Sequence, residues 1–310
     1  AITRHELLWK LNYCDNEVFP KLASPSSPST STKKTIQTYE KDDGTIALRS
    51  DGASILFSAT SWTEDEDFSL LYDALLKLNK ELSALQGIEN PSSNMPPRIL
   101  VVITGKGPQK EMYMEKFAKL ERENLTHIAI RTPWLEPEDY PKMVATSALG
   151  ICLHTSTSGL DLPMKVLDMF GSGIPVAAVN FNALSELVKH GENGVIFRSK
   201  FDDDDDVNGY NDLQTELIDL LLDLFRYQYF DKTTKSGKNK SKAKDECKLH
   251  KLKQNVRNEA LDGKSRWEHN WNMKMSKLIK NMIFHHINRS SWFLFYIFLL
   301  LVFLVKCFYF

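Results

Sequence analysis

Residues 149–179 read LGICLHTSTSGLDLPMKVLDMFGSGIPVAAV, two apolar runs separated by a polar loop and an amphipathic stretch. Leu149–His154 and Pro175–Val179 have the length and apolar character of buried strands. Between them, Pro163 suits the first turn of a helix, because its φ angle is already helical and its missing N–H would have no partner there. A strand, a helix and a strand in this order predict a βαβ unit with parallel strands.

The same alternation extends over residues 53–197. Helices are expected at Asp67–Leu85, Gln109–Glu123 and Glu138–Ser147, where apolar residues recur at helical spacing. Right-handed crossovers would join these elements into an α/β fold, a Rossmann-like doubly wound parallel sheet whose ligands bind beyond the carboxyl ends of the strands. The remaining strands are expected at Ile55–Ala59, Ile99–Thr104, His127–Arg131 and Val195–Phe197.

Composition divides the chain into further parts. The segment 24–35 is rich in Ser, Thr and Pro, and the segment 232–253 is rich in Lys, so both should be solvated. A helix with Trp267 and Trp271 four residues apart should close the domain by packing back on it. In order, the expected parts are residues 1–52, an interdomain segment and linker; 53–230, the sheet domain; 231–255, a low-complexity insertion; 256–291, the closing helix at Lys264–Asn281; and 292–310, a hydrophobic helix.

The overall charge and the cysteines exclude several classes of protein. The formal net charge is -1, so no nucleic-acid partner is expected from the charge of the whole molecule. The four cysteines are far apart, unlike the paired ligands of a zinc site or a secreted disulfide framework, which favours a reducing, cytosolic setting. No signal peptide is expected, because residues 1–20 carry charges throughout.

The segment 292–310, WFLFYIFLLLVFLVKCFYF, is apolar and aromatic except for Lys306. As a helix it would be about 28 Å long, close to the thickness of a bilayer core, so we expect it to cross a membrane. Basic residues before it would keep the bulk of the chain in the cytosol. The alternative is an apolar helix buried in a protein core.

Two segments have the residue types of an anion site. Thr104–Pro108 (TGKGP) ends a predicted strand and opens a helix, so its amides could face an anion, although a plain strand-to-helix turn is the alternative. It lacks the third glycine of a dinucleotide fingerprint and is not a Walker A loop. On the helix after Pro163, a polar stripe of Lys165, Asp168 and Ser172 could serve a nucleotide diphosphate, or could hold an ordinary surface ion pair. The apolar residues opposite that stripe are Met164, Leu167 and Phe170.

Four strings of sequence in succession resemble the donor-binding half of GT-B glycosyltransferases. Their amino-acid sequences are similar to those of the chitobiosyldiphosphodolichol β-mannosyltransferases, a family of the glycosyltransferase family 33 type. The resemblance covers residues 53–198 and implies that the sheet domain is the C-terminal, nucleotide-sugar-binding half of a GT-B fold. The strings are SATSWTEDEDF at 58–68, ITGKGP at 103–108, TPWLEPEDYP at 132–141 and HTSTSGLDLPMKVLDMFG at 154–171.

The resemblance implies roles for particular residues. Asp168 would bond the ribose of GDP-mannose, although GT-B enzymes usually have Glu there, and Lys165 would neutralise the departing diphosphate. Residues 60–67 are acidic where many GT-B enzymes have Arg and Lys, a form that the resembled family shares. Glu186 is a weaker donor-site candidate whose alternative is a solvated helix face, and His154 is a candidate for sugar contact or for a hydrogen-bonded core histidine. Phosphate or sugar contacts would come from Gly105, Lys106, Gly107, Ser158, Gly159 and Leu160.

The activity implied by the resemblance is transfer of mannose from GDP-mannose to GlcNAc2-PP-dolichol, the first, β-1,4-linked mannose of lipid-linked oligosaccharide synthesis for protein N-glycosylation. No cofactor or metal is implied, and the partners would be the dolichol-linked chitobiosyl diphosphate, the endoplasmic reticulum membrane and possible other lipid-linked oligosaccharide mannosyltransferases. The catalytic domain would face the cytosol. The general base is expected in an N-terminal half that this chain lacks. The alternatives are a non-catalytic nucleotide-sugar-binding fragment without the acceptor domain, and a nicotinamide dehydrogenase.

Overall fold

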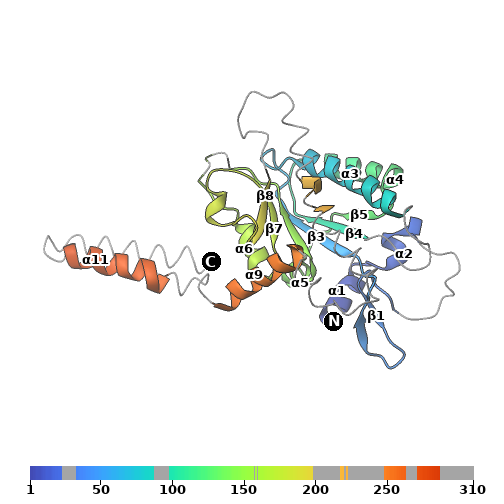
Figure 1. Ribbon diagram of the computed structural model, residues 1–310, viewed down its shortest axis with the longest axis horizontal. Coiled ribbons are helices and arrows are strands. Elements are labelled where there is room, and N and C mark those ends of the chain that lie inside the picture. The colour runs from blue at the N-terminus through green and yellow to red at the C-terminus, as the bar shows by residue number, and fades with distance from the viewer. Residues whose placement is uncertain are drawn as a thin grey trace. The chain divides into compact units, whose positions relative to one another are not determined.

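The computed structural model describes residues 1–22, 33–86, 98–156, 158, 160–197, 217–219, 221–222, 248–262 and 271–286. Its centre is a parallel sheet of six strands in the order β5-β4-β3-β6-β7-β8 (Figure 1). Because chain order reverses on either side of β3, the predicted doubly wound sheet is confirmed. The strands are β3 (Ser54–Ala59), β4 (Ile99–Thr104), β5 (Ile128–Arg131), β6 (Leu149–Cys152), β7 (Val176–Val179) and β8 (Gly194–Phe197).

Both faces of the sheet are buried, which explains why the strands read as continuous apolar runs. Alternate residues of β3 point to opposite sides: Leu56 belongs to one hydrophobic core and Phe57 to another. The first core includes side chains of α3 (Phe68–Gln86) and α4 (Lys110–Glu123), and the second includes side chains of α5 (Tyr140–Thr146) and α6 (Met164–Gly171).

The N-terminal residues differ from the interdomain segment predicted for residues 1–52. They form α1 (Ile2–Lys10), α2 (Asp15–Val18), the short 3-10 helix η1 (Pro20–Leu22) and a hairpin of β1 (Thr38–Glu40) and β2 (Ile46–Leu48). Leu7, Leu8, Tyr13, Val18 and Phe19 are all buried in the second core. These residues therefore pack on the sheet domain, whereas the predicted linker at residues 24–35 lies mostly outside the described residues.

The C-terminal residues also differ from expectation where they are described. The predicted low-complexity insertion at residues 231–255 overlaps α9 (Lys248–Asp262), whose Leu249 and Leu252 are buried in the first core. Between β8 and α9, residues 217–219 and 221–222 are described and helical. The described cysteines, Cys14 and Cys152, are free thiols.

Residues 258–310 form a second compact unit, separate from residues 1–257. Within it, the π-helix η3 (Trp271–Met275) continues into α11 (Ser276–His286), so the described part of the helix predicted at Lys264–Asn281 is helical, while its packing on the sheet domain stays a prediction. The hydrophobic helix predicted at residues 292–310 lies outside the described residues, and none of the described helices is long and apolar enough to cross a membrane.

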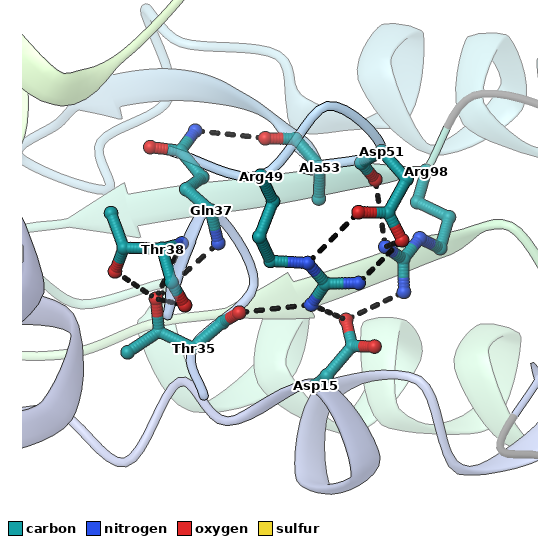
Figure 2. Close-up of polar contacts among 8 residues, drawn as sticks. All are labelled: Asp15, Thr35, Gln37, Thr38, Arg49, Asp51, Ala53 and Arg98. Carbon is teal, nitrogen blue, oxygen red and sulfur yellow. Dashed lines mark hydrogen bonds and ion pairs between the residues drawn. The ribbon is translucent and has the colours of Figure 1, made fainter. Parts of the chain in front are cut away.

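A network of buried charges attaches the N-terminal residues to the amino-terminal edge of the sheet (Figure 2). The Arg98 guanidinium, next to the start of β4, donates to an Asp15 carboxylate oxygen at 2.5 Å and to the Asp51 carbonyl at 2.8 Å. Arg49 donates to both carboxylates as well, at 2.9 Å to Asp15 and 2.6 Å to Asp51. The Arg49 and Arg98 side chains are 3% and 4% exposed, so their charges depend on these partners.

Arg98→Ala is expected to lower the free energy of unfolding by about 2 to 3 kcal/mol, since it removes one of the two cations that pair with the Asp15 carboxylate and leaves Arg49 as its remaining ionic partner. Chemical denaturation measures the loss. Lys119→Ala, on the exposed side of α4, is the control and should change stability by less than about 0.5 kcal/mol. Equal stabilities of the two variants would show that the network does not hold the N-terminal residues.

His127 should make the fold acid-sensitive. Its side chain is fully buried, and neither ring nitrogen has a hydrogen-bond partner within the described part of the chain. Burial lowers its pKa, so at acidic pH the unfolded chain takes up a proton more readily than the folded chain. Stability therefore falls as pH drops below about 6.5, the unfolded value for histidine. In urea titrations at pH 7.5 and 5.5, His127→Leu should lose less stability than the wild type, and an equal loss would contradict this assignment.

Candidate functional site

The loop after β3, residues 60–67, is organised by the carboxylate of Glu66. This side chain is 2% exposed and accepts hydrogen bonds from the Thr60 hydroxyl and, at 2.9 Å, from the Ser61 amide. Its second oxygen pairs with the ammonium of Lys165 on α6. A buried carboxylate is tolerated only with such partners, so the pairing fixes this loop against the start of α6.

Trp62 fixes the same loop to the hydrophobic core. Its side chain is fully buried and stacks on Phe68 with ring centroids 4.7 Å apart. Its φ angle of 51° lies in the left-handed region, which bulky non-glycine residues rarely occupy. Such strain, of order 1 kcal/mol or more, persists only where the surroundings fix the backbone, as they do at binding and catalytic loops.

Gly105 and Gly107 allow the loop after β4 to touch the loop after β3. A Cβ atom on Gly105 would lie 1.8 Å from the Thr60 carbonyl oxygen, and one on Gly107 would lie 1.6 Å from the Ser61 carbonyl oxygen. No side chain fits at either position, which gives these glycines a packing role in addition to any role in anion binding. The two neighbouring loops therefore form one surface.

Lys106 lies beside this contact and points to the next loop. Its ammonium is 3.9 Å from the ring centroid of Trp134, which follows β5. Both side chains are exposed, with Trp134 at 52%. A cation over an exposed indole is worth about 0.5 to 1 kcal/mol. Lys106 is thus held at the carboxyl end of the sheet while its charge remains open to solvent.

The loop after β6 is tied to the loop after β3 through His154. Its Nδ1 lies 2.7 Å from Asp65 and its Nε2 lies 3.0 Å from Asp161. Asp161 also accepts hydrogen bonds from the hydroxyls of Ser156 and Ser158. The Ser156 bond first, and then the His154 bond, lower the pKa of Asp161 to about 2, so this carboxylate is ionised at neutral pH.

The face that α6 turns to the core differs from the prediction. Val166 and Met169 are buried, whereas Met164 and Leu167, expected on the apolar side, are 71% and 44% exposed. The helix is short and has apolar residues on both sides, so its periodicity did not decide the orientation. Its exposed surface at the strand tips is consequently more apolar than the predicted polar stripe.

Asp168 and Lys165 differ in their surroundings. The Asp168 carboxylate is exposed and accepts a hydrogen bond from the Tyr140 hydroxyl at 3.0 Å. Burial and then the charge of Asp168 raise the pKa of Tyr140. Lys165 is 19% exposed and already pairs with Glu66. Asp168 therefore retains free acceptor capacity, while the charge of Lys165 is compensated within the protein.

The described residues among the predicted donor-site set all follow the carboxyl ends of parallel strands. Contacts connect the glycine loop after β4, Ser158 after β6 and Lys165 on α6 to the loop after β3. Leu160 is 82% exposed in the loop before α6, and Gly159 lies outside the described residues. Glu186 is exposed on the 3-10 helix η2 (Leu184–Glu186) after β7, and within the described chain no side-chain hydrogen bond or ion pair joins it to the others.

Four polar residues of this region were not predicted as site residues: Glu66, Asp65, Asp161 and Tyr140. The sequence placed the two former in an acidic stretch that should repel a diphosphate. Only the fold shows that Glu66 turns inward to Lys165 and Asp65 to His154. The one signal in the sequence was the position of Glu66 between Trp62 and Phe68, two large apolar residues that mark a buried turn.

A separate cavity of about 460 Å³ lies away from these loops. It is lined by residues of α2, η1, α4 and β5, among them Phe19, Phe117 and Ile130. None of the predicted donor-site residues lines it.

Gly107→Ala should lower the free energy of unfolding by about 1 to 3 kcal/mol, because the added methyl group forces the loops after β3 and β4 apart. Gly171→Ala is the matched control: an added Cβ meets nothing within 4 Å at this position on α6, so stability should stay the same or rise slightly. Thermal and urea unfolding compare the two. If Gly107→Ala were as stable as Gly171→Ala, the close packing of the two loops would be refuted.

Comparison with known proteins gives relatives that are named as glycosyltransferases. The chain is 45% identical over 195 residues to a chitobiosyldiphosphodolichol beta-mannosyltransferase of Mus musculus, and 44% identical over 194 residues to the Homo sapiens protein of that name. It is 44% identical over 191 residues to the UDP-glycosyltransferase TURAN of Arabidopsis thaliana. These alignments cover 60% to 63% of this chain but only 37% to 39% of each relative.

The chain thus spans about two-fifths of the length of the curated relatives it matches. Among solved structures, TarM superposes with a TM-score of 0.45 at 12% identity, over 76% of this chain and 35% of TarM. The sequence profile of the family described as Glycosyl transferases group 1 matches residues 56–215. Because this match extends over more than half of the 310 residues and includes the strand-tip loops described above, the chain belongs to the glycosyl transferases group 1 family.

Proposed function

We propose that this chain is the C-terminal, nucleotide-sugar-binding half of a GT-B mannosyltransferase, which moves mannose from GDP-mannose to GlcNAc2-PP-dolichol in a β-1,4 linkage. The observation that carries the proposal is its 44% to 45% identity to relatives named chitobiosyldiphosphodolichol beta-mannosyltransferase. The product would be the first mannosylated intermediate of lipid-linked oligosaccharide synthesis, with GDP released. Its place would be the cytosolic face of the endoplasmic reticulum membrane.

The position of the strand-tip loops supports donor binding there. In doubly wound sheets, ligands bind outside the carboxyl ends of the strands where chain order reverses, here between β3 and β6. The loops after these two strands are linked through His154, and α6 begins next to them. The amino end of α6 would favour the diphosphate of GDP-mannose, because its free amides and dipole attract negative charge.

Asp168 suits the proposed ribose contact. Its carboxylate is exposed, and Tyr140 occupies only one of its acceptor positions. A ribose offers two hydroxyl donors, which a carboxylate can accept at charge-assisted strength. Tyr140 would then act as a positioning residue that fixes the carboxylate before the nucleotide arrives.

Lys165 would stabilise the negative charge that develops on the departing GDP. Its pairing with Glu66 means that a bound diphosphate must share the ammonium with a protein carboxylate. This arrangement holds the ammonium in place and lets it offer its remaining donors, since an ammonium has three. The acceptor hydroxyl still requires a general base, for which this chain offers no assigned residue.

GDP binding tests the proposal directly. In titration calorimetry the wild type should bind GDP, and bind it more tightly than UDP, the nucleotide suggested by the name of the TURAN relative. Asp168→Ala and Lys165→Ala should each weaken GDP binding by about 1.5 to 3 kcal/mol, the loss of a hydrogen bond to a charged group. Asp168→Glu should recover part of the affinity.

Lys119→Ala on α4 is the control for this experiment and should leave GDP affinity unchanged. Preference for UDP would reassign the donor. Failure to bind either nucleotide, or unchanged affinity in both site variants, would reject the proposed donor site.

A further inference from the structure

Three basic residues lie on elements that pack together at the amino-terminal edge of the sheet, opposite the strand-tip loops. Lys253 of α9 donates to the carbonyl of Ser147, which lies directly after α5 and before β6, at 3.2 Å. One turn further along α9, Arg257 lies against Gly173, before β7: a Cβ on that glycine would be 3.1 Å from the Arg257 Cγ. Arg4 comes from α1, which packs against α5.

These three side chains have no acidic partner in the described part of the chain. No ion pair there involves Arg4, Lys253 or Arg257, and the acceptor for Lys253 is an uncharged carbonyl. The contrast is with Arg49 and Arg98, whose charges are compensated by carboxylates. Basic groups left together in this way repel one another.

The effect of this crowding appears in the pKa values. Burial, followed by the charges of Arg257 and Arg4, lowers the pKa of Lys253 from 10.5 to about 8. Burial and then Arg257 lower the pKa of Arg4. The three groups therefore act on one another electrostatically, and an anion among them would relieve the repulsion.

We propose that Arg4, Lys253 and Arg257 form a second anion site that binds a phosphate group, separate from the donor site at the strand tips. Two guanidinium groups provide planar pairs of N–H donors that match phosphate oxygens, and the lysine adds a point charge. The phosphate group can be free in solution or part of an anionic lipid headgroup. A bound phosphate would contact α1 and α9 together and so would stabilise their packing at this edge of the domain.

Stability against pH gives a readout that does not depend on activity. Between pH of about 8 and 10.5 the unfolded chain holds a proton on Lys253 that the folded chain has partly lost, so without an anion stability rises with pH in this window. A bound phosphate favours the charged ammonium and should flatten that rise. Lys253→Gln should remove the rise as well.

The binding test uses the full chain. Thermal unfolding at pH 7.5 is followed while inorganic phosphate replaces chloride at constant ionic strength. A bound anion raises the unfolding temperature, and the rise grows with the logarithm of the phosphate concentration once that concentration exceeds the Kd. Lys253→Gln and Arg257→Gln should each weaken phosphate binding about tenfold or more, as expected for a lost charge-assisted hydrogen bond. Lys251→Gln, an exposed lysine of the same helix, is the matched control and should respond like the wild type.

A second arm distinguishes the source of the phosphate. Sedimentation with phosphatidylcholine vesicles is compared with sedimentation with vesicles that also contain phosphatidic acid. A response to inorganic phosphate that both site variants lose supports a free phosphate ligand. Binding to phosphatidic acid that the same variants lose, without a response to inorganic phosphate, supports a lipid headgroup.

Other outcomes would overturn the proposal. If phosphate raised the unfolding temperature of the wild type and all three variants equally, the effect would be a general ion effect and the proposal would be rejected. The proposal would also be rejected if the wild type responded neither to inorganic phosphate nor to phosphatidic acid vesicles. Lys253→Gln should remain folded without phosphate, since it relieves repulsion, and Arg257→Gln provides a second test on an exposed side chain. Because both variants lie outside the strand-tip loops, unchanged GDP binding in them separates this result from that of the proposed donor site.

Discussion

The buried carboxylate of Glu66 is the interaction on which the geometry of the strand tips depends. It gathers the Thr60 hydroxyl, the Ser61 amide and the Lys165 ammonium around one nearly inaccessible group. Because an isolated buried carboxylate would cost several kcal/mol, the loop after β3 and the start of α6 are stable only together. Through Thr60 and Ser61 the same loop also sets the position of the glycines after β4.

This arrangement resolves an apparent conflict in the sequence, an acidic stretch next to a proposed diphosphate site. Glu66 faces Lys165, and Asp65 and Asp161 lie on either side of His154. The carboxylates are thus engaged by protein cations or donors, which reduces their repulsion of a ligand. What remains available at the strand tips is the exposed carboxylate of Asp168, the Lys106 ammonium and backbone amides of the loops.

The sheet could be predicted closely from the sequence, because strands buried on both faces are continuous apolar runs that need no tertiary information to recognise. Ile99–Thr104 was placed residue for residue, and the other strands within one or two residues. The helix α9 was missed because its apolar residues are sparse among charged ones, so that the Lys-rich composition suggested a solvated segment. Residues 1–22 are rich in apolar residues, but they were predicted as an interdomain segment because they precede the alternating strands and helices. Their burial depends on a surface that only the folded sheet provides.

The candidate site was predictable only in part, for a related reason. The loops that meet at the carboxyl edge of the sheet could be identified, because glycines or the first turn of a helix follow the apolar strands there. The pairing of Lys165 with Glu66 joins residues 99 positions apart, and no local pattern specifies it. The prediction of which side of α6 faces the core was wrong, because the helix has apolar residues on both sides and either Met164 or Val166 could have been buried.

Hydrogen exchange of the backbone amides, measured with and without GDP, tests the central claim most directly. Binding at the strand tips predicts slower exchange in the loops after β3, β4 and β6 and in the first turn of α6, with α2 and α4 unchanged. Protection around the cavity between α2, η1 and α4 instead, or no protection at any of the strand-tip loops, would contradict the account.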